Sequence, residues 1–266
     1  MQLWALASGS SGNCFLLESE RTRLLVECGR PLAQVERYLA HCGVSPEELD
    51  GIVLTHAHGD HSRSARDLSD LYQVPVYASR GTLSCQSLRD SALARPIDAD
   101  RPVTIGEIAV LPFAVPHDCF EPVGFRFEAD SGRAAITTDL GWVPESAQTQ
   151  LADLDLLVIE ANYDPELLSL APYPPFLKRR VAGRRGHLSN TAAAQAISAC
   201  RDRAPGAVWL AHLSENSNTA DHALRTVGKH LRRHGLGHIP VRVARHRQPS
   251  LYWNSATETV KQLPLF

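Results

Sequence analysis

The chain has 266 residues, of which 44% are hydrophobic and 21% are charged. These proportions are ordinary for a globular protein, and the length suffices for one large domain or two small ones. No run of eighteen apolar residues is present, which argues against a transmembrane helix and against a membrane partner.

The beginning of the chain and its cysteines bear on its compartment. MQLWALASGSSGN has no basic segment before a long apolar core, so we expect a first strand and a loop rather than a signal peptide. Six cysteines are spread along the chain without a CxxC pair, which is typical of thiols in a reducing compartment. We therefore expect a cytoplasmic protein.

The small net charge of −2 conceals an asymmetry. Residues 178–247 contain fourteen Lys or Arg and three Asp or Glu, whereas residues 1–177 contain twelve and twenty-five. The acidic part can supply carboxylates to a metal centre, and the basic part can bind phosphates. A solvated surface with segregated charges is the alternative.

Apolar periodicity predicts strands that alternate with helices. In chain order these are strands at 2–7, 14–19 and 22–28, a helix at 31–43, a strand at 51–55, a helix at 64–72, strands at 74–79, 106–115, 124–129, 133–139 and 155–162, a helix at 189–201, a strand at 206–214, a helix at 219–235 and a strand at 239–244. The two halves are similar, which favours two packed sheets with helices outside.

The strongest motif is THAHGDHS, which directly follows the strand at 51–55. It places His56, His58, Asp60 and His61 within six residues, and His and carboxylate are the ligands that zinc and similar divalent ions prefer. His56 and His58 can point one way from an extended loop, while Asp60 and His61 can face a second ion. Such a cluster is hard to explain as packing.

Three further candidates, His117, Asp139 and His212, each follow a predicted strand. Two metals need about six or seven ligands if one carboxylate bridges them, so the seven residues fit a di-metal hydrolase. Such metals generate hydroxide near neutral pH and clamp the attacking and leaving oxygens. Histidines suit zinc and phosphoryl chemistry often uses manganese, so both ions stay open.

The HxHxDH pattern, followed by a distant His, Asp and His, resembles the metallo-β-lactamase superfamily. Several segments are similar to its YycJ/WalJ branch: LASGSSGNC, THAHGDHS, TTDLG, IEANYD, LKRRVAGRRGHLSN and HLSENSNT. The resemblance runs from about residue 3 to residue 245. That branch is associated with 5′-to-3′ exonuclease action on double-stranded DNA.

The resemblance implies an α+β fold, the four-layer αββα sandwich, in a domain that spans residues 1–250. It implies one metal held by His56, His58 and His117, another held by Asp60, His61 and His212, and Asp139 as the bridge. Asp60 is also a candidate catalytic residue. Cys14 stands where a serine is expected, and TDLG replaces the more usual TDTG, but neither departure changes a ligand.

Five basic residues precede the GHLSN segment: Lys178, Arg179, Arg180, Arg184 and Arg185. Such clusters bind phosphate backbones without reading sequence, which favours DNA as the substrate. A solvated helix end is the alternative.

His187 in GHLSN is not needed as a ligand. In superfamily nucleases such as tRNase Z a histidine in a similar GHST setting serves as a general acid. By this resemblance His187 protonates the leaving oxygen of a phosphodiester, and its ordinary pKa of about 6.5 suits that role. Positioning of a loop is the alternative. We expect Glu160 and Asn162 beside the site as partners of ligating histidines.

The loop of residues 8–13 can form an anion nest from its backbone N–H groups, although a simple turn is the commoner reason for such a loop. Ser11 and Asn13 are its candidate site-lining residues.

We therefore predict a di-metal phosphodiesterase, most simply a DNA exonuclease in repair or replication. One alternative is a small-substrate hydrolase of the same superfamily that cleaves a thioester, lactone or cyclic nucleotide. Another is a non-catalytic regulatory protein that retains the fold, although its complete set of ligands argues against this.

The final residues, 251–266, are expected to form a tail. WNSATETV is polar and predicts an exposed linker, and the QLPLF that follows resembles the QLxLF peptide by which bacterial replication and repair proteins dock on the DNA sliding clamp. Gln262 can make oriented hydrogen bonds, while Leu263, Leu265 and Phe266 can fill an apolar pocket. The alternative is that the tail folds back on its own domain as a last strand or plug.

Overall fold

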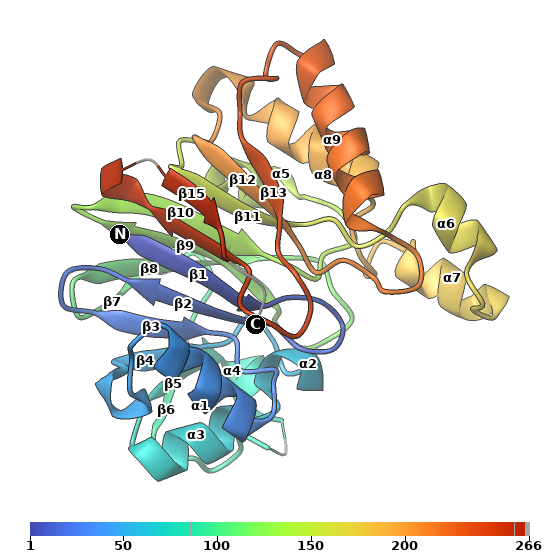
Figure 1. Ribbon diagram of the computed structural model, residues 1–266. Helices are drawn as coiled ribbons and strands as arrows, with labels where there is room; N and C mark the ends of the chain where they lie inside the picture. Colours follow the sequence, from blue (N-terminus) through green and yellow to red (C-terminus); the bar gives the residue numbers. More distant parts are fainter. Residues whose placement is uncertain (86, 258, 264–266) are drawn as a thin grey trace.

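A computed structural model describes residues 1–85, 87–257 and 259–263, and it contains two β-sheets that lie face to face (Figure 1). The first sheet has eight strands in the order β15 (Thr259–Gln262), β14 (Leu251–Asn254), β1 (Gln2–Ala7), β2 (Cys14–Glu18), β3 (Arg23–Val26), β4 (Gly51–Val53), β5 (Val76–Ser79) and β6 (Ala94–Ile97). The second has seven strands in the order β13 (Val241–Val243), β12 (Ala207–Ala211), β11 (Leu156–Glu160), β10 (Gly132–Thr137), β9 (Val123–Ala129), β8 (Ile108–Ala114) and β7 (Val103–Ile105).

Helices cover the outer face of each sheet. Helices α1 (Leu32–His41) and α3 (Ala65–Tyr72) pack on the first sheet, and α5 (Glu145–Gln150), α8 (Asn190–Ala199) and α9 (Ala220–Arg233) pack on the second. The short helices are α2 (Gly59–Ser62), α4 (Arg80–Leu83), α6 (Pro165–Leu170) and α7 (Pro175–Val181), and the last two project from one edge (Figure 1). Within the described ranges, no helix combines the length and apolarity needed to cross a bilayer.

Successive side chains along a strand point to opposite faces of its sheet, so each sheet contributes to two hydrophobic cores. In β2, Phe15 and Leu17 point into the core between the sheets, whereas Leu16 points to the core beneath α1 and α3. Trp209 of β12 is buried between the sheets from the other side. Burial of each such side chain contributes about 1.5–3 kcal/mol. The predicted αββα sandwich is confirmed.

The predicted elements that are long and periodic all form within a few residues of their expected bounds. The edge strands β6 and β7 were not predicted. Strand β6 reads ARPI, with Arg95 and Pro96 exposed, so it lacks the apolar alternation that marks a half-buried strand.

The segment before the tail differs from the expectation of an exposed linker. Leu251–Asn254 pairs antiparallel with β1, and Trp253, opposite Leu3, is buried between the sheets. Thr259–Gln262 then pairs with β14 as a last strand, so the first sheet continues past residue 250. The linker prediction is wrong there because a tryptophan in a polar run can still insert into a core.

Two tail residues predicted to bind a clamp are part of the described chain. The Gln262 side-chain amide donates to the Ser250 carbonyl oxygen at 2.6 Å, and the Leu263 N–H donates to the same oxygen at 2.8 Å. The other two, Leu265 and Phe266, lie outside the described residues.

Candidate metal centre

The predicted ligands come together at one end of the sandwich. His56 follows β4, His117 follows β8, Asp139 follows β10 and His212 follows β12. Asp139 and His212 have backbone φ angles of 59° and 53°, a left-handed conformation that non-glycine residues seldom adopt. Such strain persists where the surrounding structure enforces it, commonly at functional sites.

One group of donors consists of three histidine nitrogens. Nδ1 of His58 lies 3.0 Å from Nε2 of His56 and 3.3 Å from Nε2 of His117. These three atoms face one another closely enough to hold one metal ion. His56 and His58 can reach the same ion because they lie two residues apart on the extended segment before α2.

A second group consists of Asp60, His61 and His212. Oδ2 of Asp60 lies 3.6 Å from Nε2 of His61 and 3.3 Å from Nε2 of His212. Asp60 and His61 belong to α2, and the centroid of the His61 ring lies 4.1 Å from that of the His56 ring, so the two groups adjoin. The second group can therefore hold a second ion.

Asp139 lies between the two groups. Its Oδ2 is 2.6 Å from Nε2 of His61 and 4.0 Å from Nε2 of His56, and its Oδ1 is 3.9 Å from Nε2 of His117. A carboxylate in this position can reach ions in both groups.

The chemistry of Asp139 fits a metal. Its Oδ2 is buried and has no partner with hydrogen-bond geometry among the described residues. Burial opposes its charge, but His212 and His61 hold the pKa of Asp139 well below its usual range. It is therefore a buried, charged carboxylate among histidine nitrogens, which suits a divalent cation.

Partners on the far side of each ring orient the donor nitrogens. Thr55 Oγ1 contacts Nδ1 of His56 at 2.9 Å, and Nδ1 of His117 donates to the Gly186 carbonyl oxygen at 3.1 Å. Glu27, fully buried after β3, places Oε1 at 3.2 Å from Nδ1 of His61. Glu27 was not predicted, because nothing in its local sequence distinguishes it from an ordinary residue at a strand end.

Glu160 is buried and contacts two histidines of the site. Its Oε1 lies 2.8 Å from Nδ1 of His187 and 2.9 Å from Nδ1 of His212. Its Oε2 accepts hydrogen bonds from the N–H groups of Leu140 at 3.1 Å and Leu188 at 3.0 Å. One carboxylate therefore holds two histidines and the two loops that carry Asp139 and His187.

Asn162 also contacts the His212 segment, since its side-chain amide donates to the His212 carbonyl oxygen at 2.8 Å. Both residues expected beside the site, Glu160 and Asn162, therefore lie there.

His187 itself approaches the bridging carboxylate, with Nδ1 at 3.0 Å from Oδ1 of Asp139. Burial opposes charge on its ring, yet Glu160 and Asp139 hold the pKa of His187 well above its ordinary value. Burial likewise opposes charge on His212, but Asp139, Asp60 and Glu160 raise the pKa of His212 to about 9. The surrounding carboxylates therefore favour the protonated forms of these two histidines, and a bound cation would compete with those protons.

A pocket of about 290 Å³ opens over this cluster. Its walls include Asp60, Asp139 and His187 from the metal end, and Leu177 and Arg180 from α7. Helix α7 thus brings part of the basic segment to the same opening.

The glycine-rich loop of residues 8–13 contacts two of the metal-type residues. Asn13 is fully buried, and its Nδ2 lies 3.1 Å from Nε2 of His61 and donates to the Asp60 carbonyl oxygen at 3.4 Å. Ser11 accepts a hydrogen bond from Arg30 through its carbonyl oxygen, whereas Ser10 lines the pocket. The loop lies beside the site as expected, but Ser10 lines the pocket in place of the predicted Ser11.

The five basic residues occupy different surroundings. Arg180 pairs with Asp118, Arg184 lies over the Trp142 ring, and Arg185 donates from Nε to the His117 carbonyl oxygen at 3.0 Å. The Lys178 ammonium contacts the Ser169 carbonyl oxygen, and Arg179 is exposed on α7.

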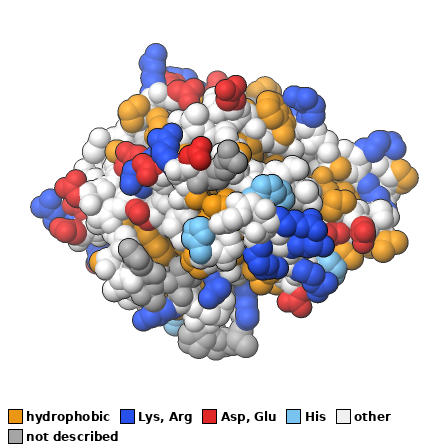
Figure 2. All heavy atoms as spheres, turned by 90° about the horizontal axis from the view of Figure 1, so that it is seen from above, with side chains coloured by type: hydrophobic (Ala, Val, Ile, Leu, Met, Phe, Trp, Pro, Cys, Tyr) orange, Lys and Arg blue, Asp and Glu red, His pale blue; other side chains and the backbone are white. Residues whose placement is uncertain are grey.

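More of the positive charge lies on α9. Four exposed basic residues belong to this helix: Arg225, Lys229, Arg232 and Arg233. Figure 2 looks down on the top of Figure 1, where α8 and α9 lie, and shows Lys and Arg side chains gathered beside histidines. Part of the basic segment therefore lies at the pocket and another part on an outer helix.

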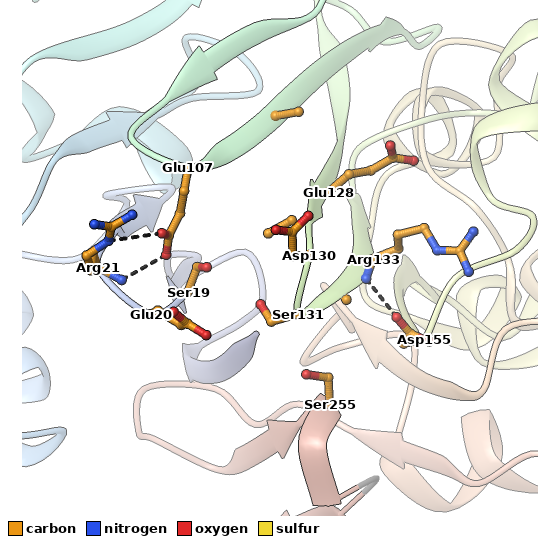
Figure 3. A pocket seen from close by; sticks show the side chains of 13 residues that line it. Ser19, Glu20, Arg21, Glu107, Glu128, Asp130, Ser131, Arg133, Asp155 and Ser255 are labelled. Atoms are coloured by element: carbon orange, nitrogen blue, oxygen red, sulfur yellow. Dashed lines mark hydrogen bonds and ion pairs between the residues drawn. The ribbon is translucent and has the colours of Figure 1, made fainter.

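A different pocket, of about 820 Å³, lies at the opposite ends of the strands. Figure 3 shows Arg21 joined to Glu107 and Arg133 joined to Asp155 around it. Glu107 precedes β8 and Arg133 lies at the start of β10, whereas the metal-type donors follow the ends of these strands. The clusters of metal-type side chains found among the described residues all lie at the other end.

Comparisons with known proteins agree with this arrangement. A family model described as a beta-lactamase superfamily domain matches residues 22–213, a range that includes all seven predicted ligands. The chain is 33% identical over 240 residues to the exodeoxyribonuclease WalJ of Streptococcus pneumoniae, covering 87% of this chain and 88% of that protein. It is 30% identical over 240 residues to the exodeoxyribonuclease YycJ of Bacillus anthracis, covering 87% and 89%.

Among solved structures, the metallo-beta-lactamase fold protein YhfI from Bacillus subtilis is similar in fold. Its TM-score is 0.73 at 19% sequence identity, with 95% of this chain and 98% of that chain covered. A chain of this family with such a donor cluster is a metal-dependent hydrolase. The chain therefore belongs to the metallo-β-lactamase superfamily, and within it to the branch that contains WalJ and YycJ.

Proposed function

We propose that the protein is a di-metal phosphodiesterase that degrades DNA from an end. The observation that carries this proposal is the pair of donor groups with Asp139 between them, in a pocket that also receives Arg180 from a basic helix. The similarity to two proteins named exodeoxyribonucleases supports DNA as the substrate.

In this proposal one ion would be held by His56, His58 and His117 and the other by Asp60, His61 and His212, with Asp139 as a ligand available to both. Two divalent ions, zinc or manganese, would supply Lewis acidity there, which lowers the pKa of water and offsets negative charge on a phosphate. Asp60 lines the pocket, where its carboxylate can also orient the attacking water.

His187 has the geometry of a proton donor. Its Nδ1 is engaged by Glu160 and Asp139, which leaves Nε2 to hold a proton for the leaving oxygen. A histidine within hydrogen-bond reach of a leaving group contributes typically 10²- to 10⁴-fold to the rate.

The basic residues Lys178, Arg179, Arg180, Arg184 and Arg185 would bind flanking phosphates. Such contacts position a nucleic acid without reading its sequence. We propose duplex DNA as the preferred substrate, 5′-to-3′ as the direction of digestion, and DNA repair or replication in the cytoplasm as the setting.

The test uses purified protein loaded with zinc or manganese and 5′-phosphorylated duplex DNA labelled at one end. We expect metal-dependent release of nucleotides from the 5′ end, and no cleavage by His58→Ala or Asp139→Ala variants that retain their circular dichroism spectra. His238→Ala, at an exposed histidine away from the cluster, is the matched control. Well-folded, metal-loaded protein that leaves DNA intact would refute the proposal.

Salt dependence separates a nuclease from a small-substrate hydrolase. Binding of DNA should weaken steeply as salt rises, because counterions compete for the phosphates. Turnover of a small neutral ester or lactone should not change in this way.

We further propose the DNA sliding clamp as a partner, bound through Gln262, Leu263, Leu265 and Phe266. Because Gln262 and Leu263 both bond to the Ser250 carbonyl oxygen, docking requires that these two contacts break. Deletion of 262–266 should abolish binding to a purified clamp and spare cleavage of free DNA. Lys261→Ala, just outside the motif, should bind normally, and clamp binding that survives the deletion would exclude this partner.

A further inference from the structure

Three aromatic side chains of the described chain are exposed: Phe120, Trp142 and Phe176. Their exposed fractions are 81%, 40% and 65%. Large apolar side chains that gather at one exposed place commonly mark a binding surface. The positions of these three aromatics are therefore informative.

All three lie on segments that border the catalytic pocket. Phe120 comes two residues after Asp118, and Phe176 directly precedes Leu177, both of which line the pocket. Trp142 comes three residues after Asp139. Phe120 and Trp142 therefore lie within three residues of a metal-type donor in the chain, and Phe176 is next to a residue that lines the pocket.

Trp142 is paired with a cation. The guanidinium carbon of Arg184 lies over its ring, 4.9 Å from the centroid. Arg184 is two residues before Gly186, which also lines the pocket. The indole and the guanidinium thus reach the same place from two different loops.

The loop that carries Trp142 packs closely against the loop that carries Arg184. A Cβ added to Gly141 would lie 2.4 Å from the backbone of Arg184, so the absence of a side chain permits this close approach. The Gly141 N–H donates to the Pro116 carbonyl oxygen at 3.0 Å, and the preceding Leu140 N–H donates to Glu160. Trp142 is therefore held at a defined position relative to Asp139 and His187.

Chain geometry limits the distance from Trp142 to the cluster. Three residues span at most about 11 Å, so the Trp142 Cα lies within roughly that distance of the Asp139 Cα. This is about three base-stacking steps of 3.4 Å in a DNA strand. A nucleic acid whose phosphate occupies the pocket can therefore reach the indole with a base.

We propose that Trp142, with Arg184 over its ring, is a stacking site for an unpaired nucleobase of the substrate. The occupant is a nucleobase because Arg184 places positive charge over the indole and Arg180 lines the neighbouring pocket, an arrangement that suits a polyanion. Stacking on an aromatic requires a base face that is not covered by a neighbouring base, and an unpaired strand can turn such a face toward the indole more freely than a duplex end can. The inference rests on the proposed function and sharpens it: the substrate enters with its terminal bases unpaired.

The first test is a binding measurement with phosphorothioate oligonucleotides, which resist cleavage, and the full-length, metal-loaded protein. One single-stranded probe carries bases, and a second of equal length carries abasic residues with the same number of phosphates. We expect Trp142→Ala to weaken binding of the first probe about tenfold and to leave binding of the second unchanged. Trp142→Phe, which keeps an aromatic face, should restore most of the affinity.

Leu71→Ala is the matched control, because Leu71 is a 61% exposed hydrophobic side chain on α3, which contributes no residue to the lining of the pocket. It should bind both probes like the unmodified protein. Equal losses for both probes in Trp142→Ala would assign Trp142 a structural role, and no loss for either would also overturn the proposal.

Fluorescence gives a second readout that a structural role would not produce. Trp142 is exposed, whereas Trp4, Trp209 and Trp253 are half-buried or buried. The probe with bases should quench the intrinsic tryptophan fluorescence, and Trp142→Phe should remove this quenching. Quenching that persists in Trp142→Phe would contradict a base on this indole.

The substrate consequence is tested with duplexes that have either blunt ends or three unpaired nucleotides at the 5′ end. We expect faster cleavage of the unpaired ends, and loss of this preference in Trp142→Ala. If base-dependent binding holds but no DNA is cleaved, the proposed nuclease function fails while the stacking site stands. If cleavage holds without any base-dependent effect of Trp142, only the stacking site fails.

Discussion

Asp118 and Arg180 form a two-point ion pair across the catalytic pocket. Oδ2 of Asp118 accepts hydrogen bonds from Nε of Arg180 at 2.7 Å and from its Nη2 at 2.6 Å. The other oxygen, Oδ1, lies 3.3 Å from Nε2 of His117 and 3.8 Å from Nε2 of His58. One carboxylate therefore touches both the candidate metal centre and the basic helix α7.

Substitution of Asp118 should weaken catalysis by releasing both neighbours. We expect Asp118→Asn to lower kcat/KM about tenfold, since outer partners of metal ligands typically contribute 10- to 100-fold to activity or metal affinity. Steady-state kinetics on DNA and metal content per chain are the measurements.

The double variant Asp118→Asn/Arg180→Ala tests whether the two residues act together. Residues in contact are not additive, so the double variant should be little worse than Arg180→Ala alone. If the fold-losses of kcat/KM in the two single variants multiply in the double variant, Asp118 and Arg180 do not act together. Loss of one metal ion per chain in Asp118→Asn would instead make Asp118 a ligand.

Glu160→Gln should slow the reaction without removing the fold. The amide keeps the size of the carboxylate but cannot offer two charged contacts to His187 and His212. We expect a rate about 10- to 100-fold lower, measured as kcat at saturating DNA, with an intact circular dichroism spectrum. Glu145→Gln, on the exposed surface of α5, should be unchanged, and a similar rate for both variants would contradict this role.

Removal of metal should destabilise the protein as well as inactivate it. A ligand that binds only the folded state at 100 times its Kd stabilises by about 2.7 kcal/mol. For a chain of this size that corresponds to a rise in Tm of about 5–10 °C when zinc or manganese is returned to chelator-treated protein. Calorimetry checks the shift, which should shrink in His58→Ala, and a Tm indifferent to metal would contradict a resident site.

Substitutions of Arg179 and Arg185 should distinguish binding of phosphate from positioning of the His117 segment. Arg179 is exposed on α7, so Arg179→Ala should leave kcat unchanged and reduce the slope of log K against log salt by about 1. Arg185 also holds the His117 carbonyl oxygen, so Arg185→Ala should lower kcat in addition. Binding titrations at several salt concentrations and single-turnover rates are the measurements, and identical behaviour of the two variants would contradict the distinction.

The sequence by itself determined the fold class and singled out the seven metal-type residues, and the family resemblance implied how they group. Four of these residues occupy one short motif, and the others each follow an apolar strand, so local patterns suffice to find them. The four long helices were equally visible, because apolar periodicity is a property of neighbouring residues.

Only the tertiary structure showed which partners orient those residues. Glu27 meets His61, and Asp118 meets Arg180 across 62 positions of sequence, and neither pair has a local signature. It also separated the basic residues into a pocket-lining Arg180, an Arg184 over Trp142 and an exposed Arg179. The physical reason is that such contacts depend on how distant strands and loops pack, whereas a sequence pattern records only what lies near in the chain.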